Sequence, residues 1–201
     1  MLSGLSHYRT GLLPPSEYAM NTSLFDTAPD FDQPIAVLRH CHDRIRKQLR
    51  TLRLLAGREG AAASPDERAQ AASAVLRYFE KAAPNHHADE EQDLLPMLRD
   101  TARGEDAALL ESLTPGILDD HHKMEPLWHA LEAPLRRIAA QEPAALDAQA
   151  VAEFGALYLS HMDIEEGQIA PMAKRLFSDE QMRRLGDAMR RRRGVAGQEE
   201  A

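Results

Sequence analysis

Apolar residues recur at helical spacing along the chain, and two of these stripes share one pattern. Each stripe has apolar residues separated by seven, four and three positions, with a single His inside it. The two stripes are Leu38, Ile45, Leu49 and Leu52 around His42, and Ile117, Met124, Trp128 and Leu131 around His121. Stripes of this period predict helices that bury one face.

Punctuating residues set the bounds of two helices in the first half. Pro34 is acceptable in a first turn, so the first helix is expected to run from there to about Ala56, before Gly57. The segment Ser64-Pro65-Asp66-Glu67 combines an N-cap Ser, a Pro and a Glu three residues on, and predicts the start of a second helix. Pro84 removes a backbone donor and predicts a bend within this helix.

The second half predicts two further long helices and a short one. A third helix is expected from Thr114-Pro115, with Pro126 and Pro134 as bends, a fourth from about Ala144 to Arg175, and a fifth from Ser178 to Gly194. Four long helices with short connections predict an all-α, up-down four-helix bundle, whose centre can hold a metal site.

The chain divides into three parts by this pattern. Residues 1–32 contain Pro14, Pro15 and Pro29, show no sustained period, and are predicted to form an N-terminal arm. Residues 33–194 are the predicted bundle domain, and 195–201 a C-terminal tail.

Composition supports the helical prediction and limits the function classes. Only 5% of residues are aromatic, and Ala, Leu, Arg and Glu are abundant. The net charge of -8 argues against broad nucleic-acid binding, because a phosphate backbone would repel most of this surface. The run Arg190 to Arg193 is a local exception, which we interpret as a solvated helix end rather than a docking patch.

Location and redox state also follow from the sequence. No stretch approaches the roughly 20 apolar residues of a membrane-spanning helix, and the first residues lack a signal-peptide core, so a cytoplasmic protein without membrane partners is expected. Cys41 is the only cysteine, which excludes an internal disulfide. It is expected to be a small half-buried residue rather than a thiolate ligand.

A twelve-residue motif occurs twice, beginning at His86 and at His161. Both copies read H-x-x-x-E-E-x-x-[LI]-x-P-M. Residues four apart on a helix share a face, so His86 with Glu90, and His161 with Glu165, each present an imidazole beside a carboxylate. Such pairs suit iron, manganese or zinc.

The apolar stripes select six candidate ligands. Choosing His121 over His122 keeps Ile117 and Met124 on the ligand face. One His on an apolar stripe is usually a hydrogen-bonded core residue, but four helices that each deliver one favour a metal, since unpaired buried charges cost several kcal/mol. The candidates are His42, His86, Glu90, His121, His161 and Glu165, while His87, Glu91, His122, His129 and Glu166 are expected mostly on the outer face or in support of the ligands.

On these motifs the chain resembles the hemerythrin-like, or HHE cation-binding, domains over about residues 33–175. The resemblance implies a non-haem centre of two iron ions in a four-helix bundle. It also implies that Glu90 and Glu165 bridge the irons and that the four His are terminal ligands.

The chain departs from the oxygen-carrying members of this family. Those carriers have a His-x-x-x-His pair on the third helix and a His-x-x-x-x-Asp pair on the fourth, whereas Leu118 and Glu125 flank His121 here, and Glu165 follows His161. The pattern is more similar to the iron-centre repair (RIC-type) di-iron proteins and bacterial HHE proteins. Fewer terminal ligands leave more open iron positions, which favours redox or metal-handling chemistry over oxygen storage.

The resulting hypothesis is a di-iron protein that binds or reacts with oxygen, peroxide or nitric oxide, in stress response or iron-centre maintenance. Tyr78 and Tyr158 are candidate hydrogen-bond donors near the site. The alternative is an oxygen or iron sensor without turnover, so whether the protein is an enzyme stays open. The sequence lacks H-E-x-x-H, G-x-S-x-G and a Gly-rich phosphate loop, which removes the strongest signals of zinc proteases, serine hydrolases and nucleotide binding.

Overall fold

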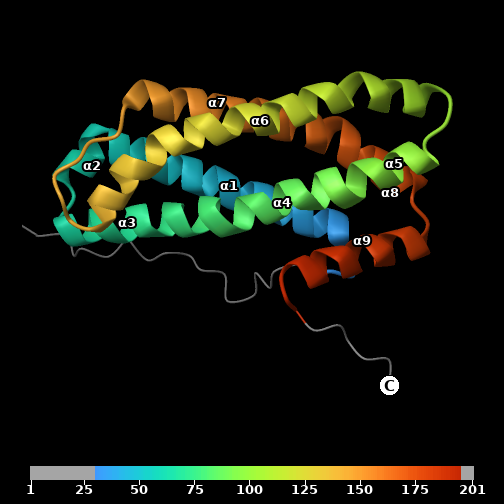
Figure 1. The fold of residues 1–201 in the computed structure, drawn as a ribbon, viewed down its shortest axis with the longest axis horizontal. Coiled ribbons are helices and arrows are strands. Elements are labelled where there is room, and N and C mark those ends of the chain that lie inside the picture. The colour runs from blue at the N-terminus through green and yellow to red at the C-terminus, as the bar shows by residue number, and fades with distance from the viewer. Residues whose placement is uncertain (1–29, 196–201) are drawn as a thin grey trace, which may run out of the picture.

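The computed structural model describes residues 30–195, and within this range it contains helices and no strand, which confirms the all-α prediction. The long helical rods, which we number in chain order, lie side by side in Figure 1. The elements are α1 (Pro34–Ala56), α2 (Arg58–Ala62), α3 (Pro65–Arg77), η1 (Tyr78–Ala82), α4 (Ala83–Asp89), η2 (Glu90–Leu94), α5 (Leu95–Thr101), α6 (Glu105–Ala139), α7 (Ala148–Ile164), η3 (Glu165–Ile169), α8 (Ala170–Leu176) and α9 (Asp179–Arg192), where η marks a π-helical segment.

The rods contact one another in a closed ring. Helix α1 packs against α3, α3 against α6, α6 against α7, and α7 against α1. The second rod is continuous from α3 through α5, and the fourth from α7 through α8. Helix α9 packs outside the ring, against α1, α4 and η2. No helix in the described range is both long and apolar enough to cross a membrane.

Two of the predicted helix starts, those of α3 and α9, have side-chain caps. The Ser64 hydroxyl accepts from the Glu67 backbone N–H at 3.3 Å, and Ser64 N donates to the Glu67 carboxylate at 2.9 Å. Ser178 and Gln181 form the same reciprocal pair at the start of α9. Each cap satisfies backbone donors that the first turn leaves free. The predicted bounds of α1 are also confirmed.

Two predicted helix starts are wrong. Helix α6 begins at Glu105, so that Thr114-Pro115 lies inside it. The Thr114 hydroxyl donates to the Leu110 carbonyl at 2.7 Å, within the helix, instead of capping a new one. Helix α7 begins at Ala148 rather than Ala144, because the Asp147 carboxylate accepts from the backbone N–H groups of residues 149 and 150.

The interpretation of residues 190–193 as a solvated helix end is also wrong. Arg190 is 8% exposed and pairs with Asp32 at 2.5 Å, while Arg192 and Arg193 both pair with Asp89 of α4. The Asp89 side chain is fully buried, and a buried carboxylate needs a charged partner. The guanidinium groups of Arg192 and Arg193 meet this need. Only Arg191 of the four is exposed. The arginines therefore fasten α9 to the first half of the ring.

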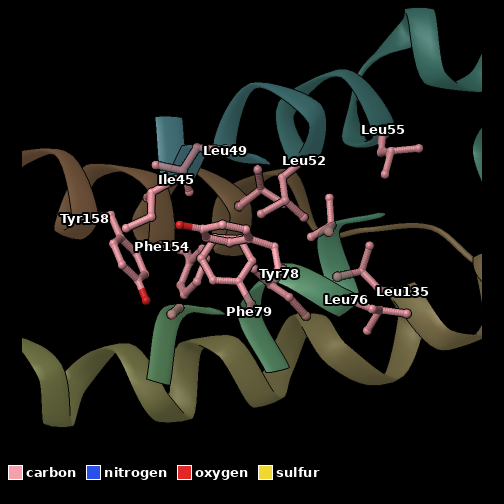
Figure 2. Close-up of a cluster of buried hydrophobic side chains, with 14 of the residues drawn as sticks. Ile45, Leu49, Leu52, Leu55, Leu76, Tyr78, Phe79, Leu135, Phe154 and Tyr158 are labelled. Carbon is pink, nitrogen blue, oxygen red and sulfur yellow. The ribbon is translucent and has the colours of Figure 1, made fainter. Parts of the chain in front are cut away.

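The core consists of two apolar clusters. One contains Ile45, Phe79, Leu135, Phe154 and Tyr158, which Figure 2 shows packed between the rods. The other contains Leu38, Leu94, Ile117, Ile169 and Met172. Along every rod, the candidate ligands occupy positions between a residue of one cluster and a residue of the other. The polar layer therefore divides the core in two. The predicted arm lies outside the described residues except for residues 30–32, as does most of the predicted tail.

Candidate metal centre

The structure brings all six candidate ligands into one buried layer. Their exposed fractions range from 1% for His86 to 7% for His121. Each rod contributes a His, and the second and fourth rods also contribute a Glu. Residues distant in sequence therefore converge at the middle of the ring.

The six side chains form two groups that share both carboxylates. The first group is His42, His86, Glu90 and Glu165, and the second is Glu90, His121, His161 and Glu165. In each group one ligand atom from every residue lies within 4.8 Å of the others. Two adjacent cation sites with common carboxylates are the arrangement that this geometry permits.

The two oxygens of each carboxylate approach different groups. Glu90 Oε1 lies 3.3 Å from His86 Nε2, and its Oε2 lies 3.5 Å from His121 Nε2. Glu165 repeats this, with Oε2 at 3.2 Å from His42 Nε2 and Oε1 at 3.2 Å from His161 Nε2. Each carboxylate therefore spans the two groups.

Several of these atoms lack a hydrogen-bond partner, which is the test of whether they fit a metal. His42 Nε2, both ring nitrogens of His86, and one oxygen each of Glu90 and Glu165 are buried without one. His121 Nε2 and His161 Nε2 are 3.0 Å apart. Nitrogens about 2.1 Å from one ion and at right angles would be separated by about this distance. Because burying unsatisfied polar atoms costs about 1–3 kcal/mol each, the donor set fits metal cations.

The second Glu of each motif forms a hydrogen bond with a His from the other half of the chain. Glu166 Oε1 lies 2.8 Å from His42 Nδ1, and Glu91 Oε1 lies 2.6 Å from His121 Nδ1. Carboxylates that accept from the outer nitrogen of a His fix its orientation and tautomer. The inner nitrogens of His42 and His121 are thereby left free to face a cation.

The two motif histidines differ in what lies beside the outer nitrogen. Neither His161 Nδ1 nor His86 Nδ1 has a hydrogen-bond partner, but an Asp120 oxygen lies 3.5 Å from His161 Nδ1. Asp120 precedes His121 as Cys41 precedes His42, so the half-buried Cys41 stands where the other half has an acid. Burial raises the pKa of the Cys41 thiol despite nearby Arg193. Cys41 belongs to neither ligand group.

Burial and mutual contact separate the pKa values of the shared carboxylates. Desolvation, followed by the charge of Glu165, raises the pKa of Glu90 well above its ordinary value. Desolvation acts in the same direction on Glu165, but the nearby imidazoles of His161 and His42, each 3.2 Å from a Glu165 oxygen, outweigh it and hold that pKa well below normal. Desolvation also lowers the pKa of His86, so its imidazole is a neutral donor.

Each of the two shared carboxylates lies on the first residue of a π-helical segment. Glu90 begins η2 and Glu165 begins η3, and the backbone N–H of the residue after each segment bonds to the carbonyl of that Glu. Segments of this kind are frequent at functional sites. All three π segments end two residues before a proline, Pro84, Pro96 or Pro171, and the wider turn accommodates its ring and missing N–H. Proline alone is insufficient, since α6 contains three without a π segment.

The remaining sequence candidates divide into three kinds. His87 stacks on His121, with ring centroids 4.0 Å apart, and burial lowers the pKa of His87 to about 3. His122 and His129 are exposed. The Tyr78 hydroxyl donates to the Cys41 carbonyl at 3.0 Å, beside a ligand rather than to one. Tyr158 stacks near His87 at 6.0 Å.

Sequence reasoning assigned no role to Arg46, Asp89 or Asp120. Arg46 donates to Glu166 at 2.8 Å and so supports the carboxylate that holds His42. The sequence feature that could have indicated a role for Arg46 is its position one turn after His42, on the same helix face. The burial of Asp89 depends on the packing of α9, which no local pattern encodes.

Two pockets lead to the layer from different sides. A cavity of about 80 Å³ reaches Glu90 and Glu165, between apolar residues such as Leu38 and Ile169. A cavity of about 420 Å³ reaches His121 and is also lined by His87, Trp128 and Tyr158. Small molecules therefore have a route towards each ligand group.

Comparison with known proteins agrees with this geometry. Residues 33–173 match the model of the hemerythrin HHE cation-binding domain, so α9 lies beyond the matched region. The chain is also 26% identical over 165 residues to an uncharacterized protein of Haemophilus influenzae, covering 82% of this chain and 92% of that protein. With a family match over most of its length and a buried layer of His and Glu, the chain belongs to the hemerythrin HHE cation-binding family.

Proposed function

We propose that residues 33–194 form a hemerythrin-like up-down bundle that holds two iron ions at the six buried ligands. In this proposal His42 and His86 would hold one ion, His121 and His161 would hold the other, and Glu90 and Glu165 would be shared by both. The observation that carries it is the placement of the two oxygens of each carboxylate near different groups.

The donor set suits iron and disfavours sites that need thiolate ligands. Mixed imidazole and carboxylate ligands suit iron, manganese and zinc, whereas the absence of Cys from both groups disfavours a thiolate-type zinc or iron–sulfur site. Each group supplies four side chains, fewer than the roughly six ligands of an octahedral ion. Positions therefore remain for a small ligand.

The proposed activity is binding or reaction of oxygen, peroxide or nitric oxide, in stress response or iron-centre maintenance. The iron pair would supply the redox chemistry, and the protein supplies its setting. The apolar clusters on both sides keep bulk water from the layer, while Glu91 and Glu166 orient two of the imidazoles. The His-x-x-x-Glu pairs favour a protein of the iron-centre repair type over an oxygen carrier. We further propose a cytoplasmic protein that does not bind nucleic acid.

The test is to load the protein with ferrous iron anaerobically and measure metal by elemental analysis. Two irons per chain are expected, and one zinc, or no metal, would contradict the proposal. Stopped-flow spectra of the reduced protein mixed with oxygen, nitric oxide or peroxide then address reactivity. Rapid oxidation without a long-lived oxygen complex is expected, together with nitric oxide binding or peroxide consumption. A stable, reversible oxygen complex would favour carriage or sensing.

A sensor without turnover is the second candidate function, and the position of α9 favours it. Arg192, the last residue of α9, and the following Arg193 both pair with Asp89, the residue directly before Glu90. Metal loss at Glu90 could thus loosen a helix at the surface. Hydrogen exchange of α9 with and without iron separates the candidates: sensing requires faster exchange in the metal-free protein, and equal exchange contradicts it.

A further inference from the structure

His87 stands at the boundary between the larger cavity and the second ligand group. It lines the cavity of about 420 Å³ that also reaches His121 and Tyr158. Its ring lies nearly parallel to that of His121, at 12° and 4.0 Å between centroids, and 6.4 Å from that of His161. The side chain is therefore adjacent to both terminal His residues of this group.

The Nε2 atom of His87 is buried and has no hydrogen-bond partner. Among the described residues outside the six ligands, only Gln48 and Arg68 also have such atoms, and neither lines the cavities that reach the ligand layer. A buried imidazole nitrogen without a partner costs free energy comparable to a lost hydrogen bond. Its position beside the second group suggests that its partner is something the group holds.

His87 does not itself complete the ligand set. Neither group of converging ligand atoms includes it, although the first group includes the preceding residue, His86. Its ring stacks on the face of His121 instead of meeting that residue at Nε2. A side chain so placed is suited to contact a molecule bound next to His121.

We infer that His87 is a hydrogen-bonding residue for a small exogenous ligand, anionic or diatomic, that binds at the second metal group through the larger cavity. This inference rests on the proposed two-metal centre and adds an assignment of ligand side and partner. The two groups then differ in function: the second receives the exogenous ligand, and the first has no equivalent imidazole. Position 162, which aligns with His87 in the second motif, is an apolar Met.

The test uses azide as a small anionic probe of the oxidised, iron-loaded protein. The variants are His87→Leu, His87→Gln and a matched control, His122→Leu, which changes an exposed His lining the same cavity. Metal content, the azide dissociation constant and the azide stretching frequency are measured for each. His87→Leu should retain two irons, bind azide about tenfold more weakly as one hydrogen bond is lost, and shift the stretching frequency. His87→Gln should recover part of the affinity, and the control should match the wild type.

Each other outcome overturns a distinct statement. If His87→Leu and His87→Gln both lose one iron, His87 is a ligand and the inference is wrong. If both keep two irons with unchanged azide affinity and frequency, it is wrong and the proposed two-metal centre stands. If the wild-type protein holds no pair of irons, the inference and the proposed function fail together. Should His87→Leu not fold, His87→Gln decides, since lower affinity and a shifted frequency are required of it too.

Discussion

The two halves of the chain supply the same types of candidate ligand but surround them differently. Each half has one lone His, one His-x-x-x-Glu pair and a π segment that starts at the Glu. In the first half, however, Asp89 forms ion pairs with Arg192 and Arg193, and His86 Nδ1 has no hydrogen-bond partner. In the second half Ile164 occupies the position of Asp89, and Asp120 lies beside His161. A repeat can therefore preserve a donor set while its electrostatic setting diverges.

The largest expected effect is on metal content, and it tests the two carboxylates that both groups share. Glu90→Ala or Glu165→Ala removes a carboxylate that belongs to both groups, so either variant should lose one or both irons, and to a similar extent. Glu91→Ala and Glu166→Ala are the controls and should retain two, because these residues contact His rather than completing a group. Elemental analysis after anaerobic loading measures this. The opposite pattern would show that the ligand register is wrong by one residue.

The next effect breaks the first half at its contact with α9. Asp89→Ala leaves two arginines without their buried partner and should lower the free energy of unfolding by about 3 kcal/mol. Ile164→Val at the aligned position should cost about 1 kcal/mol. Urea unfolding of the metal-free proteins measures both. If both substitutions lower the free energy of unfolding equally, the ion pairs of Asp89 contribute no more than ordinary packing.

A smaller effect concerns the outer partners of the motif histidines. Asp120→Asn weakens the acceptor beside His161 and should lower metal affinity at the second group about tenfold. Cys41→Ser changes the aligned position of the first half, where His86 has no partner to lose, and should leave affinity within about twofold. Competition with a chelator gives both constants. If both substitutions weaken metal binding equally, the proposed electrostatic difference between the two groups is wrong.

The smallest effect arises from Arg46, one turn after His42. It supports Glu166 at 2.8 Å, while the aligned residue in the other half is Glu125, which is exposed. Arg46→Ala should lower stability by less than about 1 kcal/mol, because the pair is partly solvated. The loss should diminish in high salt. A loss of several kcal/mol, independent of salt, would indicate that Arg46 fixes the position of His42.

The convergence of the six candidate ligands was predictable because the information is local. The spacing of His86 and Glu90, and the apolar stripe around His42, follow from helical periodicity. Helix starts were predicted where Ser caps them, but Thr114 looked like a cap and serves inside α6. The roles of Arg192 and Arg193 depend on where α9 docks, a tertiary contact without a periodic signature. The three π segments each end two residues before a proline, Pro84, Pro96 or Pro171, of which only the first was predicted to distort its helix.

The crossed contacts between the halves have an evolutionary consequence. His42 of the first half relies on Glu166 of the second, and His121 of the second relies on Glu91 of the first. A chain of half this length would carry an incomplete site and could complete it only by pairing with a copy of itself about a two-fold axis. If two such copies were joined in one gene, the two sequences would no longer have to be identical. Each half could then place different residues beside the shared set, as Cys41 and Asp120 do at aligned positions.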